Sequence, residues 1–211
     1  MPAEHFGRLT QDLVIGRKTV AARLFATHGY ERTSIGDLVR ACDLSRGAIY
    51  HYFDSKEAIL FAMMDTLVRG LLETLQEAAS IEAAPVERLE NIIMAFVESN
   101  ARSPDEQIIL LNDIGALSRA EQKQIHAIEK QIVDLVGDAI VAADARGLVT
   151  PKTRKVYTMM LFGMINYTYT WYDAKGPVKP RDLARMATDL FFNGFLPEKR
   201  AAKPALRVAK S

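Results

Sequence analysis

Residues 33–60 read T-S-I-G-D-L-V-R-A-C-D-L-S-R-G-A-I-Y-H-Y-F-D-S-K-E-A-I-L, and this stretch decides the fold. Residues 34–42 and 46–51 within it have the apolar spacing of two short helices joined at Asp43-Leu44. Helices this short are not stable alone, so they must pack on the apolar stripes before and after them. The pattern predicts a helix-turn-helix whose second helix enters the major groove of DNA. The apolar residues expected on its packed side are Ile35, Leu38, Val39, Leu44 and Ile49.

The polar residues of this stretch have the chemistry that DNA requires. Thr33 and Ser45 are predicted N-caps, and the N-terminus of a helix suits a phosphate oxygen. Gly47 allows the backbone to approach the duplex closely. A guanidinium fork fits guanine, so we expect Arg46 to read a base, whereas hydroxyl and ammonium donors fit phosphates. The predicted DNA-binding residues are Thr33, Ser34, Ser45, Arg46, Gly47, Ala48 (on a thymine methyl group), His51, and the phosphate donors Tyr50, Tyr52 and Lys56.

Four side chains near the predicted turn and second helix have alternative interpretations. Tyr50 is either a DNA contact or a core aromatic residue, whereas Phe53 is expected in the core. His51 either faces the groove or is solvated on the surface. Cys42 is expected to be a small buried apolar residue rather than a redox sensor.

The rest of the chain has helical periodicity almost throughout, with no alternating strand pattern and no internal repeat. The sequence therefore predicts an all-α protein of about nine helices. The segment from residue 108 to 117 is apolar nearly all round and is expected to be central. The expected helices outside the helix-turn-helix cover residues 13–28, ending at Gly29, then 56–79, 85–97, 104–117, 125–147, 151–172 and 180–194.

The amino-acid composition limits the partners that the protein can bind and the cellular compartment in which it is expected. The chain has 211 residues with 27 Lys plus Arg and 26 Asp plus Glu, which gives a net charge of +1. This near-neutral balance does not favour an architectural DNA-binding protein, which needs a strongly basic surface. A single cysteine excludes an internal disulfide framework and a zinc site built on several thiolates. The sequence lacks a secretory signal and a long apolar span, so a cytoplasmic protein with no membrane contact is expected.

An enzymatic function is not expected from the motifs. The sequence contains no nucleophile elbow, phosphate-binding glycine loop, metal-spaced His/Asp cluster or paired-carboxylate motif. We expect neither a catalytic residue, nor a metal site, nor a cofactor.

The helix-turn-helix stretch resembles the DNA-binding domain of the tetracycline-repressor (TetR) family over about residues 11–71. The resemblance rests on Thr33, Ser45, Gly47, Ile49, Tyr50, Tyr52-Phe53 and Lys56. Two positions depart from the family pattern. Cys42-Asp43 stands where the family usually has Ala-Gly, and Asp tolerates the left-handed conformation that Gly supplies there. Tyr52 stands where a His is usual, with His51 one place earlier.

The resemblance implies a function and a domain plan. It implies a homodimeric transcriptional repressor that binds a palindromic DNA operator and is released by a small hydrophobic effector. An activator, or a regulator that responds to a hydrophobic drug or metabolite without CoA, is the alternative. The expected domains are residues 1–54 for DNA binding, 55–197 for ligand binding and dimerisation, and a basic, disordered tail at 198–211.

Residues 163–177 are similar to a subgroup of this family that responds to acyl-CoA thioesters, so an acyl-CoA is the expected effector. Asn112 and Asp113 lie in an apolar segment, where they either hydrogen-bond within the core or face a ligand. Lys123, Lys130 and Lys155 are the expected cations for CoA phosphates. The predicted ligand-binding residues are Met63, Phe96, Ile109, Asn112, Asp113, Met160 and Met164, and the predicted dimer interface contains Leu183, Met186, Leu190 and Phe191.

Overall fold

The computed structural model describes residues 18–193, and this part of the chain contains helices and connecting segments but no strand, which confirms the all-α class. Its nine α-helices are α2 (Lys18–His28), α3 (Ile35–Cys42), α4 (Arg46–Tyr52), α5 (Lys56–Ser80), α6 (Pro85–Arg102), α7 (Pro104–Asp113), α8 (Arg119–Ala143), α9 (Arg154–Asn166) and α10 (Pro180–Asn193). Two short 3-10 helices, η2 (Ile114–Ala116) and η3 (Tyr167–Thr170), follow α7 and α9. The predicted start of the first helix at residue 13 and the predicted tail lie outside the described residues.

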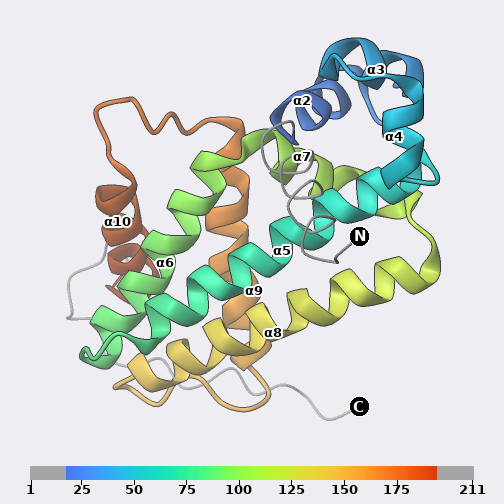
Figure 1. The fold of residues 1–211 in the computed structure, drawn as a ribbon. Helices are drawn as coiled ribbons and strands as arrows, with labels where there is room; N and C mark the ends of the chain where they lie inside the picture. Colours follow the sequence, from blue (N-terminus) through green and yellow to red (C-terminus); the bar gives the residue numbers. More distant parts are fainter. Residues whose placement is uncertain (1–17, 194–211) are drawn as a thin grey trace.

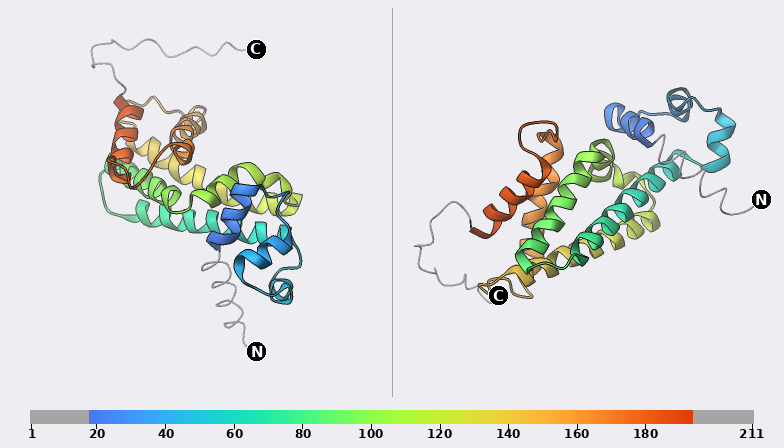
Figure 2. Two further views of the ribbon diagram at one scale, coloured as in Figure 1. Left: turned by 90° about the horizontal axis from the view of Figure 1, so that it is seen from above. Right: turned by 60° about the vertical axis from the view of Figure 1, so that its left-hand side comes forward.

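The long helices α5 and α8 run side by side along the molecule (Figure 1). Helices α2, α3 and α4 lie at one end of α5, and α6, α9 and α10 gather around its other half (Figures 1 and 2). None of the helices within residues 18–193 is long and apolar enough to cross a membrane.

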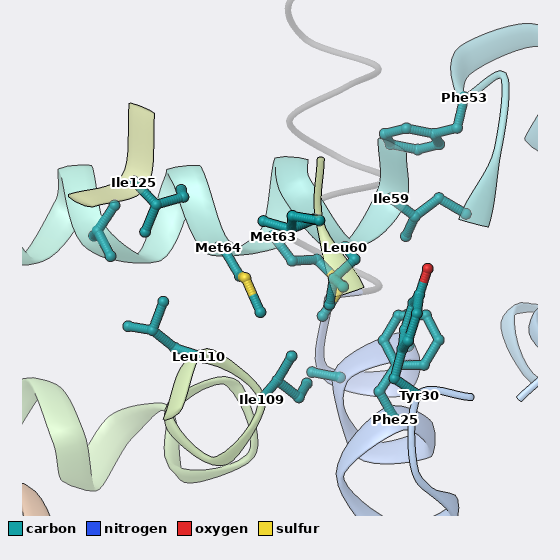
Figure 3. Close-up of a cluster of buried hydrophobic side chains, with 14 of the residues drawn as sticks. Phe25, Tyr30, Phe53, Ile59, Leu60, Met63, Met64, Ile109, Leu110 and Ile125 are labelled. Carbon is teal, nitrogen blue, oxygen red and sulfur yellow. The ribbon is translucent and has the colours of Figure 1, made fainter. Parts of the chain in front are cut away.

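Two apolar clusters lie along α5. The first joins the helix-turn-helix to the body, because α2, α3 and α4 share it with α5, α7 and α8 (Figure 3). Phe25 of α2, Met64 of α5 and Ile109 of α7 are all buried in it. The second cluster lies farther along α5 and is closed by α6, α8, α9 and α10. The helix-turn-helix and the first half of the body therefore share one core.

We predicted which residues end α2 and α3 and which residue caps the start of α3. Two of these three predictions are confirmed. Gly29 ends α2 with a φ of 84°, and Asp43 ends α3 in the left-handed conformation with a φ of 51°, as predicted. The third prediction is wrong, because the N-cap of α3 is Ser34 rather than Thr33. Ser34 accepts from the backbone of Asp37, whose carboxylate accepts from the backbone of Ser34 in return. This reciprocal capping box satisfies two backbone N–H groups, which a cap at residue 33 would not do.

Other predicted elements also differ from the structure: α6 continues to Arg102 rather than ending at residue 97, α7 ends at Asp113 rather than at 117, and α8 begins at Arg119 rather than at 125. Helix α9 begins at Arg154 rather than at residue 151 and ends at Asn166, where the chain tightens into η3 instead of continuing to residue 172. Helix α8 ends at Ala143, before Gly147 with its φ of 66°. Helix α7 is not buried on all sides, as a central helix would be, because Leu111 and Asn112 are exposed.

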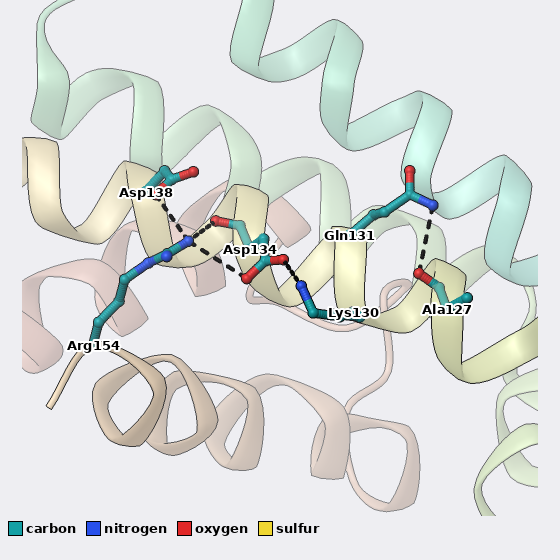
Figure 4. Close-up of polar contacts among 6 residues, drawn as sticks. All are labelled: Ala127, Lys130, Gln131, Asp134, Asp138 and Arg154. Carbon is teal, nitrogen blue, oxygen red and sulfur yellow. Dashed lines mark hydrogen bonds and ion pairs between the residues drawn. The ribbon is translucent and has the colours of Figure 1, made fainter. Parts of the chain in front are cut away.

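The side chain of Arg154 at the start of α9 makes polar contacts with α8 (Figure 4). Nη2 of Arg154 donates to the backbone oxygen of Asp134 at 2.6 Å and lies 2.8 Å from Oδ1 of Asp138. Gly137 makes this approach possible, because a Cβ there would lie 2.7 Å from Nε of Arg154 and 3.0 Å from Oγ1 of Thr158.

Candidate DNA-binding and effector sites

Helix α4 has the cap and the exposure that the predicted recognition helix requires. Oγ of Ser45 accepts from the backbone N–H of Ala48 at 3.0 Å, which confirms Ser45 as the N-cap. Ile49 points into the first cluster and is 3% exposed, so the position of α4 on the body is fixed by packing. The opposite side of the helix is open to solvent, with Arg46 and Gly47 exposed at its first turn.

The aromatic residues around α4 divide between surface and core. Tyr50 is 46% exposed and is not a core residue, whereas Phe53 is buried in the first cluster as predicted. His51 is exposed, and its ring lies edge-on to the half-buried ring of Tyr52, with 4.9 Å between centroids. Cys42 is half-buried at the end of α3. Tyr50 and His51 therefore lie on the open surface with Arg46.

Two of the side chains that were predicted to lie near phosphates form hydrogen bonds within the protein. The side chain of Thr33 is buried, and its hydroxyl donates to the backbone oxygen of Gly29 at 2.9 Å. Nζ of Lys56 donates to the backbone oxygen of Tyr30 at 2.9 Å and lies 4.1 Å from the centroid of that ring. Both side chains hold the segment between α2 and α3, and Lys56 ties this segment to the first turn of α5.

Acidic side chains gather where α2 and α7 meet. Burial raises the pKa of Asp113 at the end of α7, and the nearby charge of Glu31 raises it further. Burial also raises the pKa of the Tyr30 hydroxyl, and the charges of Glu57, Glu31 and Asp113 act in the same direction. The ionised form of Asp113 is therefore less favourable in the folded protein than in the unfolded chain.

Replacing Asp113 with Asn is expected to raise the free energy of unfolding at pH 7. A carboxyl whose folded pKa is raised destabilises the fold above that pKa, and the penalty disappears as the pH falls through it. The gain of D113N in melting temperature over the wild type should therefore shrink as the pH is lowered from 7 through the raised pKa of Asp113.

The matched control is D105N in the first turn of the same helix. Asp105 faces the positive end of the helix dipole, so its loss should lower the melting temperature at pH 7. Equal shifts for both variants would contradict the assigned role of Asp113.

The seven predicted ligand-binding residues do not line one cavity. Met63 and Ile109 are buried in the first cluster, and Phe96 is buried in the second. Asn112 is exposed, and its amide donates to the backbone oxygen of Ile108 at 2.8 Å, so it faces neither the core nor a cavity. Met160 is 59% exposed. The remaining two, Asp113 and Met164, are half-buried, and the lysines predicted for CoA phosphates, Lys123, Lys130 and Lys155, are all exposed.

Hollows with other linings lie in the described part of the body instead, and one of them, of about 380 Å³, lies between the first half of α6 and the start of α10. A groove of about 770 Å³ runs between the start of α6, the end of α8 and α10, and the rings of Tyr157, Phe191 and Phe192 lie on its wall. A smaller cavity of about 360 Å³ lies where the end of α6, the start of α7 and η3 meet, and it is lined in part by Asn100 and Thr168. The predicted set did not contain these two residues. The available signal was Asn100, a polar residue three places after Val97 on the apolar stripe of α6.

Helices α9 and α10 carry apolar side chains that face solvent. On α9, Val156 lies three residues before Met159 and four before Met160, which places these side chains on one side of the helix. On α10, Met186 and Leu190 are exposed, but Leu183 and Phe191 are half-buried against the second cluster. The predicted interface residues therefore divide into two exposed and two inward-facing side chains. The exposed apolar face consists of Val156, Met159, Met160, Tyr167, Met186 and Leu190.

A helix-turn-helix with an exposed second helix, mounted on a helical body, defines the class of DNA-binding transcriptional regulators. Residues 19–63 match the model of bacterial regulatory proteins of the tetR family, and residues 82–195 match the tetracyclin repressor-like C-terminal domain. The chain belongs to the TetR family, as the resemblance in its helix-turn-helix indicated.

This chain is similar to solved structures of the family over most of its length and to curated members over shorter stretches. A TetR-family regulator from Bordetella parapertussis 12822 is 38% identical, with a TM-score of 0.79 over 86% of this chain and 96% of the other. AibR, solved with isovaleryl coenzyme A and operator DNA, is 29% identical, with a TM-score of 0.71 over 82% and 94%. The repressor KstR2 of Mycobacterium tuberculosis is 34% identical over 38% of this chain and 40% of its own length. The chain spans two fifths to two thirds of the first curated relatives that it matches.

Proposed function

We propose that this protein is a homodimeric repressor that binds a partly palindromic operator and releases it when a small acyl compound, such as an acyl-CoA thioester, binds the body. The observation that carries the proposal is the capped helix α4, which is held by Ile49 and presents Arg46, Tyr50 and His51 to solvent. One short recognition helix reads only a few base pairs, so a specific site requires two of them.

The exposed apolar face of α9 and α10 supports the dimer. Met160 of α9 and Met186 of α10 are 59% and 60% exposed in the single chain, and exposed apolar side chains of this size mark a protein interface. A second copy of the chain would bury both faces in a four-helix bundle.

The effector part of the proposal rests on similarity and on geometry. AibR, which was solved with isovaleryl coenzyme A, shares the fold and 29% of its sequence with this chain. Helix α7 packs on α2, so a change at the start of α7 reaches the DNA-binding end. A tilt of these helices would move the two recognition helices off the spacing of roughly 34–36 Å that DNA requires. A regulator that responds to a hydrophobic drug, or that activates transcription, remains the alternative.

The operator experiment tests the DNA-binding part directly. The full-length protein is used to select binding sites from random duplex DNA, and the selected site is then footprinted. We expect two symmetry-related half-sites that are protected together. A single protected half-site without symmetry would contradict the homodimer.

Replacing Arg46 with Ala is expected to relax base preference at one position of each half-site, at a cost of about 1–3 kcal/mol. Arg46 is exposed in the first turn of α4, where a guanidinium reaches the edge of a base. Affinity is measured for the selected site and for its single-base variants. The control is R146A, an exposed arginine after α8, which should bind every site as the wild type does. A uniform loss over all sites for R46A would make Arg46 a phosphate contact instead.

A further inference from the structure

The groove between the start of α6, the end of α8 and α10 has an apolar wall that is open to solvent. It lies at the end of the molecule opposite the helix-turn-helix (Figures 1 and 2). Leu148 and Met186 on its wall are 59% and 60% exposed. The rings of Phe191 and Phe192 are half-buried there and lie edge-on to each other, with 5.4 Å between centroids. Exposed apolar side chains gathered in this way mark a surface that another segment covers.

The charged side chains of the groove are mostly acidic. Four carboxylates and two guanidinium groups lie in its lining, and they belong to Glu90, Asp144, Asp182 and Asp189 and to Arg146 and Arg185. Within residues 18–193 none of these carboxylates forms an ion pair. The groove therefore favours an occupant that is apolar and also carries several positive charges.

The chain itself supplies such a segment directly after α10. Asn193, the last residue of α10, lines the groove, and residues 194–203 read G-F-L-P-E-K-R-A-A-K. Apolar residues come first in this stretch and basic residues follow: Phe195 and Leu196, then Lys199, Arg200 and Lys203. Ten extended residues reach at most about 33–36 Å, which is long enough to cross the groove.

A segment of the same chain has an advantage over a separate molecule. It starts at the groove, and a short connection of this kind gives an effective concentration on the order of millimolar. A second copy that presented the same groove would bring like charges together, which is unfavourable. Met186 belongs both to the groove and to the exposed apolar face, so the groove opens beside the proposed dimer interface.

We propose that residues 195–203 bind in the groove of their own chain, with Phe195 and Leu196 against the apolar wall and the basic side chains beside the carboxylates. This inference goes beyond the proposed function, because it concerns neither the operator nor the effector. The segment would join α10 to the end of α8, two elements that the groove separates. It would thereby hold in place the part of the exposed apolar face that lies on α10.

Limited trypsin digestion of the full-length protein measures this contact. The bond after Arg200 lies in the stretch proposed to bind, and the bond after Arg207 lies beyond it. Mass spectrometry follows both cleavage rates, and the free peptide of residues 194–211 gives their intrinsic ratio. Relative to that peptide, the bond after Arg200 should be cut at least about tenfold more slowly than the bond after Arg207, because cleavage requires the segment to leave the groove. The same ratio in protein and peptide would overturn the proposal.

Two groove variants test the assigned contacts. L148S removes an exposed apolar side chain from the wall, and D189K reverses a charge of the lining, so both should move the ratio of the two cleavage rates toward that of the peptide. The matched controls are V141S and D173K, at exposed positions outside the groove, which should keep the wild-type ratio. Circular dichroism establishes that each variant is folded. Wild-type protection in both groove variants would contradict the assignment of this groove.

Two further digestions identify the occupant. Protection should persist in monomeric M160E, since each chain covers its own groove, whereas its loss in that folded monomer would make a second copy the occupant and overturn the contact within one chain. Protection should also be present without DNA. Protection that appears only after the operator is added would make the basic segment a DNA contact and would overturn the proposal as well. Operator selection is a separate measurement, so the proposed function is tested independently of the groove.

The contact also predicts order where composition alone predicts disorder. If the proposal holds, the part of the tail that starts at residue 198 and ends at 203 is held on the body, and only the residues after it behave as a solvated end.

Discussion

M160E is expected to be a folded monomer that binds the operator at least about a hundredfold more weakly than the wild type. Met160 is 59% exposed in the single chain and lies at the centre of the exposed apolar face of α9 and α10. Two copies of the variant would each bury an unpaired carboxylate, which costs several kcal/mol and favours separate chains. Sedimentation gives the mass of the particle, and a gel-shift titration gives its affinity for the operator.

The matched control for this variant is V141E. Val141 is 44% exposed on α8, outside the exposed apolar face, so the same substitution should leave both the mass and the operator affinity unchanged. Leu183 is unsuitable for the test because it packs on the second cluster, where a charge would disturb the fold itself. A dimer that persists in M160E would place the interface elsewhere.

G137L is expected to lower the free energy of unfolding by about 1–3 kcal/mol, the usual cost of overfilling a packed contact. A Cβ at Gly137 already comes within 2.7 Å of Nε of Arg154, so a larger side chain must expel the guanidinium. Arg154 would then lose its bond to the backbone oxygen of Asp134 and its contact with Asp138. Chemical denaturation followed by circular dichroism measures the change.

The control is the same substitution at Gly70 on α5. A Cβ at Gly70 meets nothing within 4 Å, and glycine is a poor helix former, so G70L should be more stable than the wild type by up to about 1 kcal/mol. Opposite signs for G137L and G70L are the expected result. A stabilising G137L would show that Arg154 moves aside without loss.

The helix-turn-helix was predictable because its signals are local. Ser45 caps α4, Asp43 takes the left-handed turn, and Ile49 faces inward, and each follows from a residue type at a fixed offset. The error in the predicted helix caps arose where two hydroxyl residues are adjacent, at Thr33 and Ser34. Either side chain can cap a helix, and the choice depends on Asp37, whose carboxylate completes the capping box from Ser34 only.

The candidate effector residues were not predictable in the same way, because burial depends on which helix covers which face. Helix α9 is apolar on both sides, and its sequence does not distinguish Leu161, which is fully buried, from Met160, which is exposed. The same holds for Asn112, whose apolar neighbours indicated a position in the core or facing a ligand, although its side of α7 is open. The cavity beside Asn100 is formed by three segments far apart in the chain, and no local pattern indicates their meeting.

The first apolar cluster also affects how the protein folds and how its helices can be exchanged with those of another regulator. Helices α2, α3 and α4 bury their apolar side chains against α5, α7 and α8, so we expect them to unfold together with half of the body. Amide hydrogens in α2 should therefore exchange as slowly as those in the middle of α5. A chimera that grafts another regulator's DNA-binding helices onto this chain must carry the facing surface of α7 with them, since α2 packs on α7 and Phe25 and Ile109 are buried in one cluster.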